Sequence, residues 1–366
     1  MKCLAIVHTE SSLGWGGQEI RVLSESQGLA RRGHDVKLLC AADSRICAEA
    51  PAWQVEAVAL PIAAKRLAGV KALAGWFRRN RCDVVSTHSS TDAWLSALAL
   101  AALGRPYPMV RTRHISAPVP RNPLSRWLYT RATARIVTAG ESLRKELIER
   151  NGFPAGRIES VPTGVDAGRF RPGDRLAARN ALHLPRDKTL IGIVATLRSW
   201  KGHRFLIQAV ARLPETVGLV IVGDGPQREP LHKLVHEAGL GERILFAGNQ
   251  HDVLPWLQAL DIFALPSYAN EGVPQALLQA MLVGLPCVTT HVGSIAELAT
   301  HEVTALVVPP QDVTALRAAL ERLIAEPSLG KTLGAAARRH CAENMSYERM
   351  LERMEAVYRG VVDANR

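Results

Sequence analysis

Short apolar runs, many of them rich in Val and Ile, alternate along the chain with longer stretches in which apolar residues recur at helical spacing. In the first half the runs cover residues 3–7, 36–40, 84–87, 109–112, 136–138 and 158–161, and in the second half residues 190–194, 219–222, 244–246, 262–265, 287–289 and 305–308. Strand-length runs separated by helix-length stretches are typical of parallel sheets that helices cover on both faces. The pattern predicts an α/β protein with two doubly wound, Rossmann-like domains that face each other across a cleft.

A turn-rich segment over residues 162–174, with repeated Pro, Gly and Asp, separates the two sets of runs. We therefore expect a first domain over residues 1–170 and a second domain over residues 171–345. The remaining residues, 346–366, begin with a stretch of helical periodicity, which predicts a C-terminal helix. Because ligands of doubly wound sheets bind at the carboxyl ends of the strands, the loops after the runs are where we look for chemistry.

Composition narrows the class of protein. Of the 366 residues, 47% are hydrophobic and 22% are charged, which excludes disorder for most of the chain. The longest apolar stretches have about ten residues, whereas a bilayer span needs roughly 20. The chain starts on a strand-like run with no signal-peptide pattern, and its six cysteines form no CxxC pair. We expect a cytoplasmic protein with reduced cysteines.

Positive charge is concentrated in the first half. Residues 1–170 hold 24 Lys and Arg against 14 Asp and Glu, whereas the rest hold 21 against 20. Two basic stretches with interleaved apolar residues, within residues 65–81 and 121–135, are either amphipathic helices that lie on an anionic membrane or the solvated faces of ordinary helices. No nucleic-acid motif accompanies the charge, so we expect no nucleic-acid partner. The candidate contacts to a membrane or an acceptor are Lys71, Arg78, Arg79 and Arg126.

Three loops that follow predicted strands carry glycine or positive charge. Gly16 and Gly17 open a helical stretch, whose first amides favour an anion. Arg198 and Lys201 suit a diphosphate, because each charge-assisted contact to phosphate is worth roughly 1.5–3 kcal/mol. Gly223 begins a sharp turn, which we interpret mainly as turn chemistry. Each signal taken alone also fits an ordinary loop.

The most informative segment covers residues 270–281. Glu271 stands in the loop before a predicted helix, so the amides of Gly272 and Val273 are free to meet a ligand. Gln279 lies about five residues into that helix, roughly 7–8 Å along its axis. This separation suits one ligand that bridges both side chains, with a sugar near Glu271 and a ribose near Gln279.

The sequence offers no metal centre or nucleophile. His232 and His236 are spaced i, i+4, but no third ligand is evident. There is no Asp-x-Asp pair to hold Mg²⁺, and no Ser–His–Asp constellation. We therefore expect metal-independent chemistry in which cations and helix N-termini neutralise a diphosphate.

Taken together, these residues resemble the family 4 glycosyltransferases, a large retaining group with the GT-B fold. The resemblance covers nearly the whole chain and is carried, in order and spacing, by residues 157–166, 201–202, 223–226, 261–267 and 271–286. It implies a nucleotide-sugar donor held mainly by the C-terminal domain and an acceptor held mainly by the N-terminal domain. It also implies transfer with retention at the anomeric carbon, without a metal, and a final helix over residues 346–366 that crosses back to the first domain.

The resemblance assigns catalytic roles by position. Lys201 and Arg198 would bind the donor diphosphate, and Glu271 would contact the hydroxyls of the donor sugar. His114, which follows the run 109–112, resembles the family's histidine near the donor sugar. His88 also follows a predicted strand and is a second candidate for lining the cleft.

The remaining assignments concern donor binding, and three positions depart from the family pattern. The amides of Gly272 and Val273 would lie beside the donor sugar, the side chain at 279 would hold the ribose, and Gly16, Gly17 and Gly223 complete the donor-binding set. The family's Glu-x7-Glu has Gln279 as its second member here, and an amide oxygen still accepts a bond from a ribose hydroxyl. Thr196 stands where the family has its Arg, with Arg198 two residues later. Thr163 replaces the common Asn, a position that we expect to be structural.

We therefore expect a retaining hexosyl- or N-acetylhexosaminyl-transferase that needs no cofactor beyond a nucleotide-sugar co-substrate, preferably a UDP-sugar. The basic first half favours a lipid-linked glycan acceptor, such as lipopolysaccharide or a similar cell-envelope glycan, and a peripheral position on the inner face of the cytoplasmic membrane. Two alternatives remain open. One is a hydrolysing sugar-nucleotide 2-epimerase of GT-B fold. The other is a non-catalytic nucleotide-sugar-binding protein, an alternative that stays open because Gln279 replaces the second Glu of the family pattern.

Overall fold

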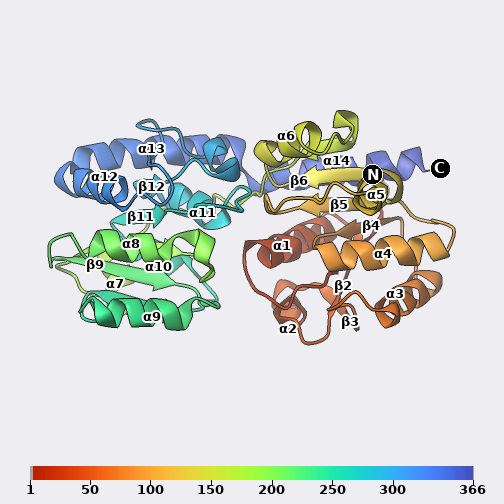
Figure 1. The fold of residues 1–366 in the computed structure, drawn as a ribbon, viewed down its shortest axis with the longest axis horizontal. Helices are drawn as coiled ribbons and strands as arrows, with labels where there is room; N and C mark the ends of the chain where they lie inside the picture. The colour runs from red at the N-terminus through yellow and green to blue at the C-terminus, as the bar shows by residue number, and fades with distance from the viewer. Residues whose placement is uncertain (1–2, 366) are drawn as a thin grey trace. The chain divides into compact units, whose positions relative to one another are not determined.

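The computed structural model describes residues 3–365, which contain two parallel sheets of seven and six strands with helices on both sides of each sheet (Figure 1). The chain forms two units. One comprises the chain up to Thr163 together with the segment from Glu348 onward, and the other is Gly164–Tyr347. The fold class predicted from the sequence, two doubly wound α/β domains, is confirmed. The change of unit falls inside the turn-rich segment 162–174.

The first sheet has the strand order β3-β2-β1-β4-β5-β6-β7. Its order reverses between β1 and β4, which places the ends of these two strands at the position where doubly wound sheets bind ligands. All six residues of β1 and all four of β4 are buried. The strands are β1 (Ala5–Glu10), β2 (Asp35–Ala41), β3 (Glu56–Leu60), β4 (Val84–Thr87), β5 (Met109–Arg113), β6 (Arg135–Thr138) and β7 (Ile158–Ser160). The helices of this unit are α1 (Gly17–Arg31), α2 (Arg45–Glu49), α3 (Leu67–Arg79), α4 (Ser90–Ala102), α5 (Pro123–Trp127), α6 (Glu141–Glu149) and α14 (Tyr347–Ala364).

The second sheet has the order β10-β9-β8-β11-β12-β13 and reverses between β8 and β11. The loops after β8 and β11 therefore lie next to each other at the carboxyl edge of this sheet. The strands are β8 (Thr189–Val194), β9 (Val217–Val222), β10 (Ile244–Gly248), β11 (Ile262–Leu265), β12 (Cys287–Thr289) and β13 (Leu306–Val307). The helices are α7 (Arg175–Ala181), α8 (His203–Val210), α9 (Arg228–Glu237), α10 (Leu254–Ala259), α11 (Gln275–Val283), α12 (Val313–Ala325) and α13 (Pro327–Asn344).

The two basic stretches differ in structure. The first is α3, but its apolar residues Leu73, Trp76 and Phe77 are buried in the protein core, so they are not available to lipid. The second stretch is divided between α5 and a π-helical turn over Leu128–Ala132. Of the two interpretations, α3 fits the face of an ordinary helix with a buried apolar side, and a membrane contact of either stretch would use its exposed side chains. None of the helices in residues 3–365 has the length and apolar character that a bilayer-spanning segment requires.

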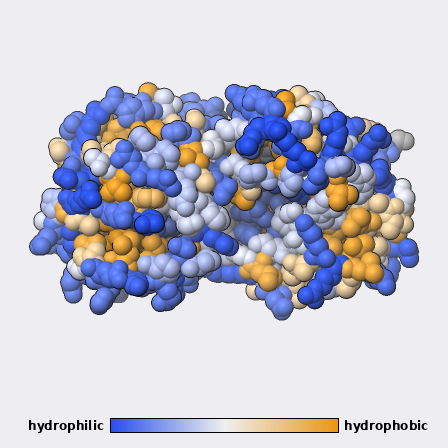
Figure 2. Space-filling view, viewed as in Figure 1, coloured by the Kyte–Doolittle hydropathy of each residue, from blue (hydrophilic) through white to orange (hydrophobic). Residues whose placement is uncertain are grey.

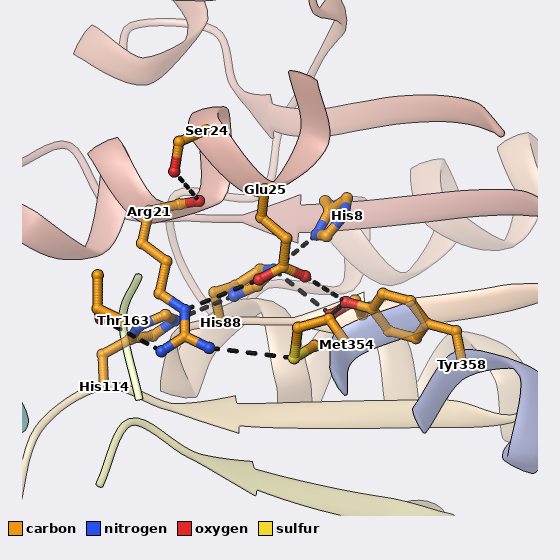
Figure 3. A network of polar contacts seen from close by, with 10 residues as sticks. His8, Arg21, Ser24, Glu25, His88, His114, Thr163, Met354 and Tyr358 are labelled. Carbon is orange, nitrogen blue, oxygen red and sulfur yellow. Dashed lines mark hydrogen bonds and ion pairs between the residues drawn. The ribbon is translucent and has the colours of Figure 1, made fainter. Parts of the chain in front are cut away.

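The C-terminal helix α14 is fixed to the first unit by a buried polar network (Figure 3). The Tyr358 hydroxyl donates to Glu25 in α1 over 2.7 Å and lies 2.9 Å from the Ser86 hydroxyl in β4. Glu25 also faces the Arg21 guanidinium at 3.7 Å, and both side chains are fully buried. Burying such charges is costly unless they are paired and hydrogen-bonded, so the network makes α14 a required part of this unit.

We expect Tyr358→Phe to lower the free energy of unfolding by about 1.5–3 kcal/mol, because it removes a donor from a buried carboxylate. Denaturant titration measures this loss. Tyr107→Phe is the matched control: its hydroxyl donates to the Phe77 carbonyl over 3.3 Å at a half-buried position, and its loss should cost about 1 kcal/mol or less. Equal losses in the two variants would contradict a special role for Tyr358.

Candidate functional site

In the second unit, the loops after β8 and β11 approach each other closely, and a glycine stands at the point of closest approach. Gly202 has a φ of 79°, and a Cβ at this position would collide with the carbonyl of Pro266. A residue with a side chain would therefore be disfavoured both by its backbone conformation and by the lack of space. This close approach brings Lys201, at the end of one loop, to Glu271, in the other.

Lys201 and Glu271 form an ion pair at this edge of the sheet. The Lys201 ammonium lies 2.7 and 2.9 Å from the two carboxylate oxygens of Glu271. The Glu271 side chain is only 4% exposed, whereas that of Lys201 is 20% exposed. The sequence predicts that both residues bind one ligand, and the structure brings them together.

Two further residues hold Glu271, and neither is among those expected from the sequence. The Ser267 hydroxyl donates to Glu271 over 2.6 Å. Gly293, in the segment after β12, has a φ of 61°, and a Cβ there would collide with the Glu271 carbonyl. The role of Ser267 could have been predicted, because it lies four residues before Glu271 in the same loop after a strand. The contact with Gly293 depends on tertiary structure alone.

Helix α11 begins at this pair. Gly272 and Val273 are buried directly before Pro274, which caps the helix, and Gln279 is the fifth helical residue. Gln279 is 7% exposed, and its amide makes no hydrogen bond with another described residue. The amide atoms of Gln279 are not among the fully enclosed polar atoms without a partner, so they are available to a ligand.

Arg198 forms no ion pair with Glu271, and Gly223 is held by backbone contacts. Arg198 is exposed, and its guanidinium lies 5.7 Å from the centre of the Trp200 ring. Gly223 follows β9, and its N–H donates to the Gly248 carbonyl over 2.8 Å. The structure therefore does not bring Arg198 to the carboxylate of Glu271, and it gives Gly223 a contact within the backbone.

His203, the first residue of α8, was not singled out by the sequence analysis. Both nitrogens of its ring are buried and have no hydrogen-bond partner among the described residues. Burial, and then the charge of Lys201, lower the pKa of His203 to about 3, so the ring is neutral. His203 therefore places a neutral ring with two unpaired nitrogens directly after the loop that carries Lys201.

In the first unit, Gly16 and Gly17 lie where the sequence predicts them, at the start of α1: Gly16 ends the loop after β1, and Gly17 is the first residue of the helix. Gly16 is the N-cap of α1 and offers no side chain to the free amides of the first turn. Next to this loop, Glu10 accepts bonds from the Ser12 amide (2.9 Å) and the Gln18 side chain (2.6 Å). Burial, followed by the charges of Asp92 and Glu19, raises the pKa of Glu10 well above its usual range.

His114 and His88 lie in one row with a third histidine, His8 (Figure 3). Nδ1 of His8 is 2.9 Å from Nε2 of His88, and Nδ1 of His88 is 3.0 Å from Nε2 of His114. We call His8, His88 and His114 the histidine row. His88 is 4% exposed and both its ring nitrogens are engaged, so it supports its neighbours rather than lining a surface for an acceptor.

All three imidazoles are held neutral. Burial is the main cause that lowers the pKa of each ring. The nearby cations Arg21, Arg113 and Arg111 lower the pKa of His114 further, whereas Glu25 partly offsets the effect of burial on His8.

The predicted acceptor or membrane contacts, Lys71, Arg78, Arg79 and Arg126, are all exposed on the first unit. Near them, Trp94 of α4 stacks on Trp127 of α5 at 6.0 Å. Lys65 lies 5.9 Å from the Trp94 ring and Arg105 lies 5.9 Å from the Trp127 ring. Leu98 follows Trp94 by one turn of α4, and Leu124 precedes Trp127 by one turn of α5; the two leucines are 45% and 67% exposed. Figure 2 shows apolar residues gathered over α4. We call Lys65, Trp94, Leu98, Arg105, Leu124 and Trp127 the aromatic-basic patch.

Within residues 3–365, no group of three or more His, Cys, Asp or Glu side chains is arranged to hold a metal ion. His232, one of the two histidines at metal-like spacing, instead stacks on Phe246 with the ring centres 4.0 Å apart.

Two family models match the chain one after the other. The model described as Glycosyltransferase Family 4 matches residues 15–169, and the model described as glycosyl transferases group 1 matches residues 174–340. Curated relatives include D-inositol 3-phosphate glycosyltransferases of Mycobacterium tuberculosis, 29% identical over 300 residues and 79% of this chain. The chain spans 59% of the length of these relatives.

Solved structures show the same fold. A glycosyltransferase from Rickettsia africae is 20% identical, with 99% of both chains covered and a TM-score of 0.87. An Anabaena protein in complex with UDP-glucose is 19% identical, with 98% of this chain and 100% of that chain covered and a TM-score of 0.87. Since both family models match in tandem on this two-sheet architecture, the chain belongs to the family 4 glycosyltransferases of GT-B fold.

Proposed function

We propose that this protein is a retaining glycosyltransferase that moves a sugar from a nucleotide-sugar donor to a hydroxyl group of an acceptor. The observation that carries the proposal is the Lys201–Glu271 pair at the point where the second sheet reverses its strand order. A cation, a carboxylate, the amides of Gly272 and Val273 and the unpaired amide of Gln279 are gathered there. These groups match a diphosphate, the hydroxyls of a sugar and a ribose diol.

The pair has a different role before and after the donor binds. Without a ligand, Glu271 neutralises Lys201. When the donor binds, its diphosphate takes over the Lys201 ammonium, and the Glu271 carboxylate accepts hydrogen bonds from sugar hydroxyls. The ion pair thus keeps two opposite charges stable at a nearly buried position until substrate replaces the interaction.

In the proposed reaction, the bond between the anomeric carbon and the diphosphate oxygen breaks as the acceptor oxygen attacks the same face of the sugar. The electron pair of the broken bond stays on the diphosphate, where Lys201 and the fixed amides stabilise it. The acceptor proton passes to an oxygen of the leaving phosphate. No divalent metal takes part in these steps, and transfer is therefore expected to continue at an unchanged rate in EDTA.

The donor is tested by thermal unfolding in the presence of nucleotide sugars. A ligand at 100 times its Kd adds about 2.7 kcal/mol of stability, which raises the Tm by several degrees. We expect UDP-sugars to stabilise more than GDP- or ADP-sugars, since an Anabaena neighbour binds UDP-glucose. The stabilising donor is then offered with a glycolipid extract. Formation of an epimer without acceptor would indicate a 2-epimerase, and binding without any transfer would indicate a non-catalytic binding protein.

We further propose that the acceptor is a lipid-linked glycan of the cell envelope and that the first unit meets it at the inner face of an anionic membrane. The aromatic-basic patch supports this, because Trp rings flanked by Lys, Arg and exposed Leu are typical of membrane interfaces. The exposed cations of α3 add attraction to anionic lipid.

Replacing Lys71, Arg78, Arg79 and Arg126 by Gln is expected to weaken binding to vesicles of anionic phospholipid by roughly 100-fold or more, because each cation near such a surface contributes about 1 kcal/mol. Co-sedimentation with vesicles measures the change. About 0.5 M salt should weaken vesicle binding of the unchanged protein in the same way, because charges several ångströms apart are screened at that ionic strength.

The matched control removes the same number of exposed cations from the second unit. These are Arg212, Lys331, Arg338 and Arg339. Equal loss of vesicle binding in both variants would mean that net charge, and not this face of the first unit, attracts the membrane.

A further inference from the structure

The histidine row is an uncommon arrangement, because its rings bind one another directly. His8 lies in β1, His88 follows β4, and His114 follows β5, so the three rings come from adjacent strands of the first sheet. The rings of His8 and His88 stack with their centres 5.1 Å apart, and those of His88 and His114 are tilted by 34° with their centres 5.3 Å apart. Four of the six ring nitrogens are used in the two contacts.

The two nitrogens left over differ in their surroundings. Nε2 of His8 is buried and has no hydrogen-bond partner among the described residues. Nδ1 of His114 also has no partner there, but it is not among the fully enclosed nitrogens. The row therefore has one sealed end, at His8, and one end that a ligand can reach, at His114.

Hydrogen bonding couples the tautomers of the three rings. A neutral imidazole carries one proton on one of its two ring nitrogens. Each hydrogen bond between two ring nitrogens needs a single proton, because two bare nitrogens or two N–H groups cannot bond to each other. If His88 carries its proton on Nε2, it donates to His8, and His114 must donate to His88 from its own Nε2. If His88 carries its proton on Nδ1, the other two rings must do the same. The three rings therefore share one tautomer, and one ring cannot change without the others.

The surrounding charges select between the two states. With all protons on Nε2, the N–H groups point from His114 toward His8, so the positive end of the row lies at His8 and the negative end at His114. Glu25 is beside His8 (Figure 3), whereas Arg21, Arg111 and Arg113 act on His114. Anions stabilise the positive end and cations the negative end, so the field favours this state. Nε2 of His8 has no hydrogen-bond partner among the described residues in either state, so the field of Glu25 is what favours a proton there.

We propose that His8 and His88 are positioning residues that keep Nε2 of His114 protonated and Nδ1 free, so that His114 presents a hydrogen-bond acceptor to a substrate hydroxyl. The substrate part rests on the proposed transferase function. The tautomer itself does not, since it follows from contacts within the first unit. Nδ1 of His114 thus accepts one bond without taking the proton, and the ring cannot turn to offer an N–H instead.

The full-length protein labelled with ¹⁵N-histidine tests the tautomer directly, because nitrogen chemical shifts distinguish a protonated from a bare ring nitrogen. We expect His8, His88 and His114 all to be protonated on Nε2 in the absence of any substrate. Different tautomers within the row, or a shared Nδ1 tautomer, would overturn the proposal. His88→Phe should leave His114 as a mixture of tautomers, whereas His34→Gln, which removes a buried histidine outside the row, should not change it.

Transfer rates then test the link to catalysis. We expect His88→Phe to lower kcat about tenfold, and the double variant His88→Phe/His114→Phe to be no slower than His114→Phe alone, since His88 acts only through His114. Losses that multiply in the double variant would overturn the positioning role. If no nucleotide sugar supports transfer while the shared Nε2 tautomer is observed, the proposed function fails and the tautomeric coupling is supported.

Discussion

Replacing Lys201 by Ala is expected to lower kcat/KM for glycosyl transfer by about 100- to 1,000-fold, the cost of removing one fixed donor to a developing oxyanion. Lys201 is the cation next to Glu271, at the edge of the second sheet where the strand order reverses between β8 and β11. Affinity for UDP should fall as well, because a charge-assisted contact to phosphate contributes roughly 1.5–3 kcal/mol. Calorimetry with UDP and initial rates of transfer measure the two effects separately.

One complication must be separated from this loss. Without Lys201, the Glu271 carboxylate is buried beside the diphosphate with no cation, and its repulsion alone would weaken binding. The double variant Lys201→Ala/Glu271→Gln removes that charge. If UDP still binds weakly to the double variant, Lys201 itself binds the phosphate, and recovery of affinity would refute the contact. Lys331→Ala, an exposed lysine of α13, is the control for net charge.

Glu271→Gln is expected to have opposite effects on binding and turnover. The amide no longer competes for Lys201, so UDP should bind roughly three- to tenfold more tightly, consistent with about 1 kcal/mol for the lost ion pair. Transfer should fall about 10- to 100-fold, because a charged acceptor of sugar hydroxyl bonds is replaced by a neutral one. Glu242→Gln, at an exposed position, should change neither quantity. Weaker UDP binding together with normal transfer would exclude the proposed exchange of partners.

Most of the fold could be predicted because its buried strands are continuous apolar runs. β4 and β11 match the predicted runs at both ends, and β8 and β9 each begin one or two residues earlier. The strand that the sequence analysis missed is β3, Glu56–Leu60, at the edge of the first sheet. Its residues are half-buried or exposed, so alternation and composition do not distinguish it from a loop.

The candidate site was predictable where its signal lies in one loop. Glu271 and Gln279 are fixed by local spacing before and within α11, and Lys201 by its position after β8. Contacts that depend on the sheet order were not predictable. Gly293 against Glu271, and His8 beside His88, join segments that are far apart in the sequence, and no local pattern records that their strands are neighbours.

The position of α14 has a consequence for how the protein is made. The first unit needs a helix that the ribosome synthesises only after the whole of Gly164–Tyr347. Until then Arg21 and Glu25 lack their contacts with Met354 and Tyr358, and the apolar surface that α14 covers is open to water. Domains encoded in one continuous stretch fold as they emerge, so the second unit is expected to fold first and the N-terminal segment to depend on chaperones until α14 has emerged.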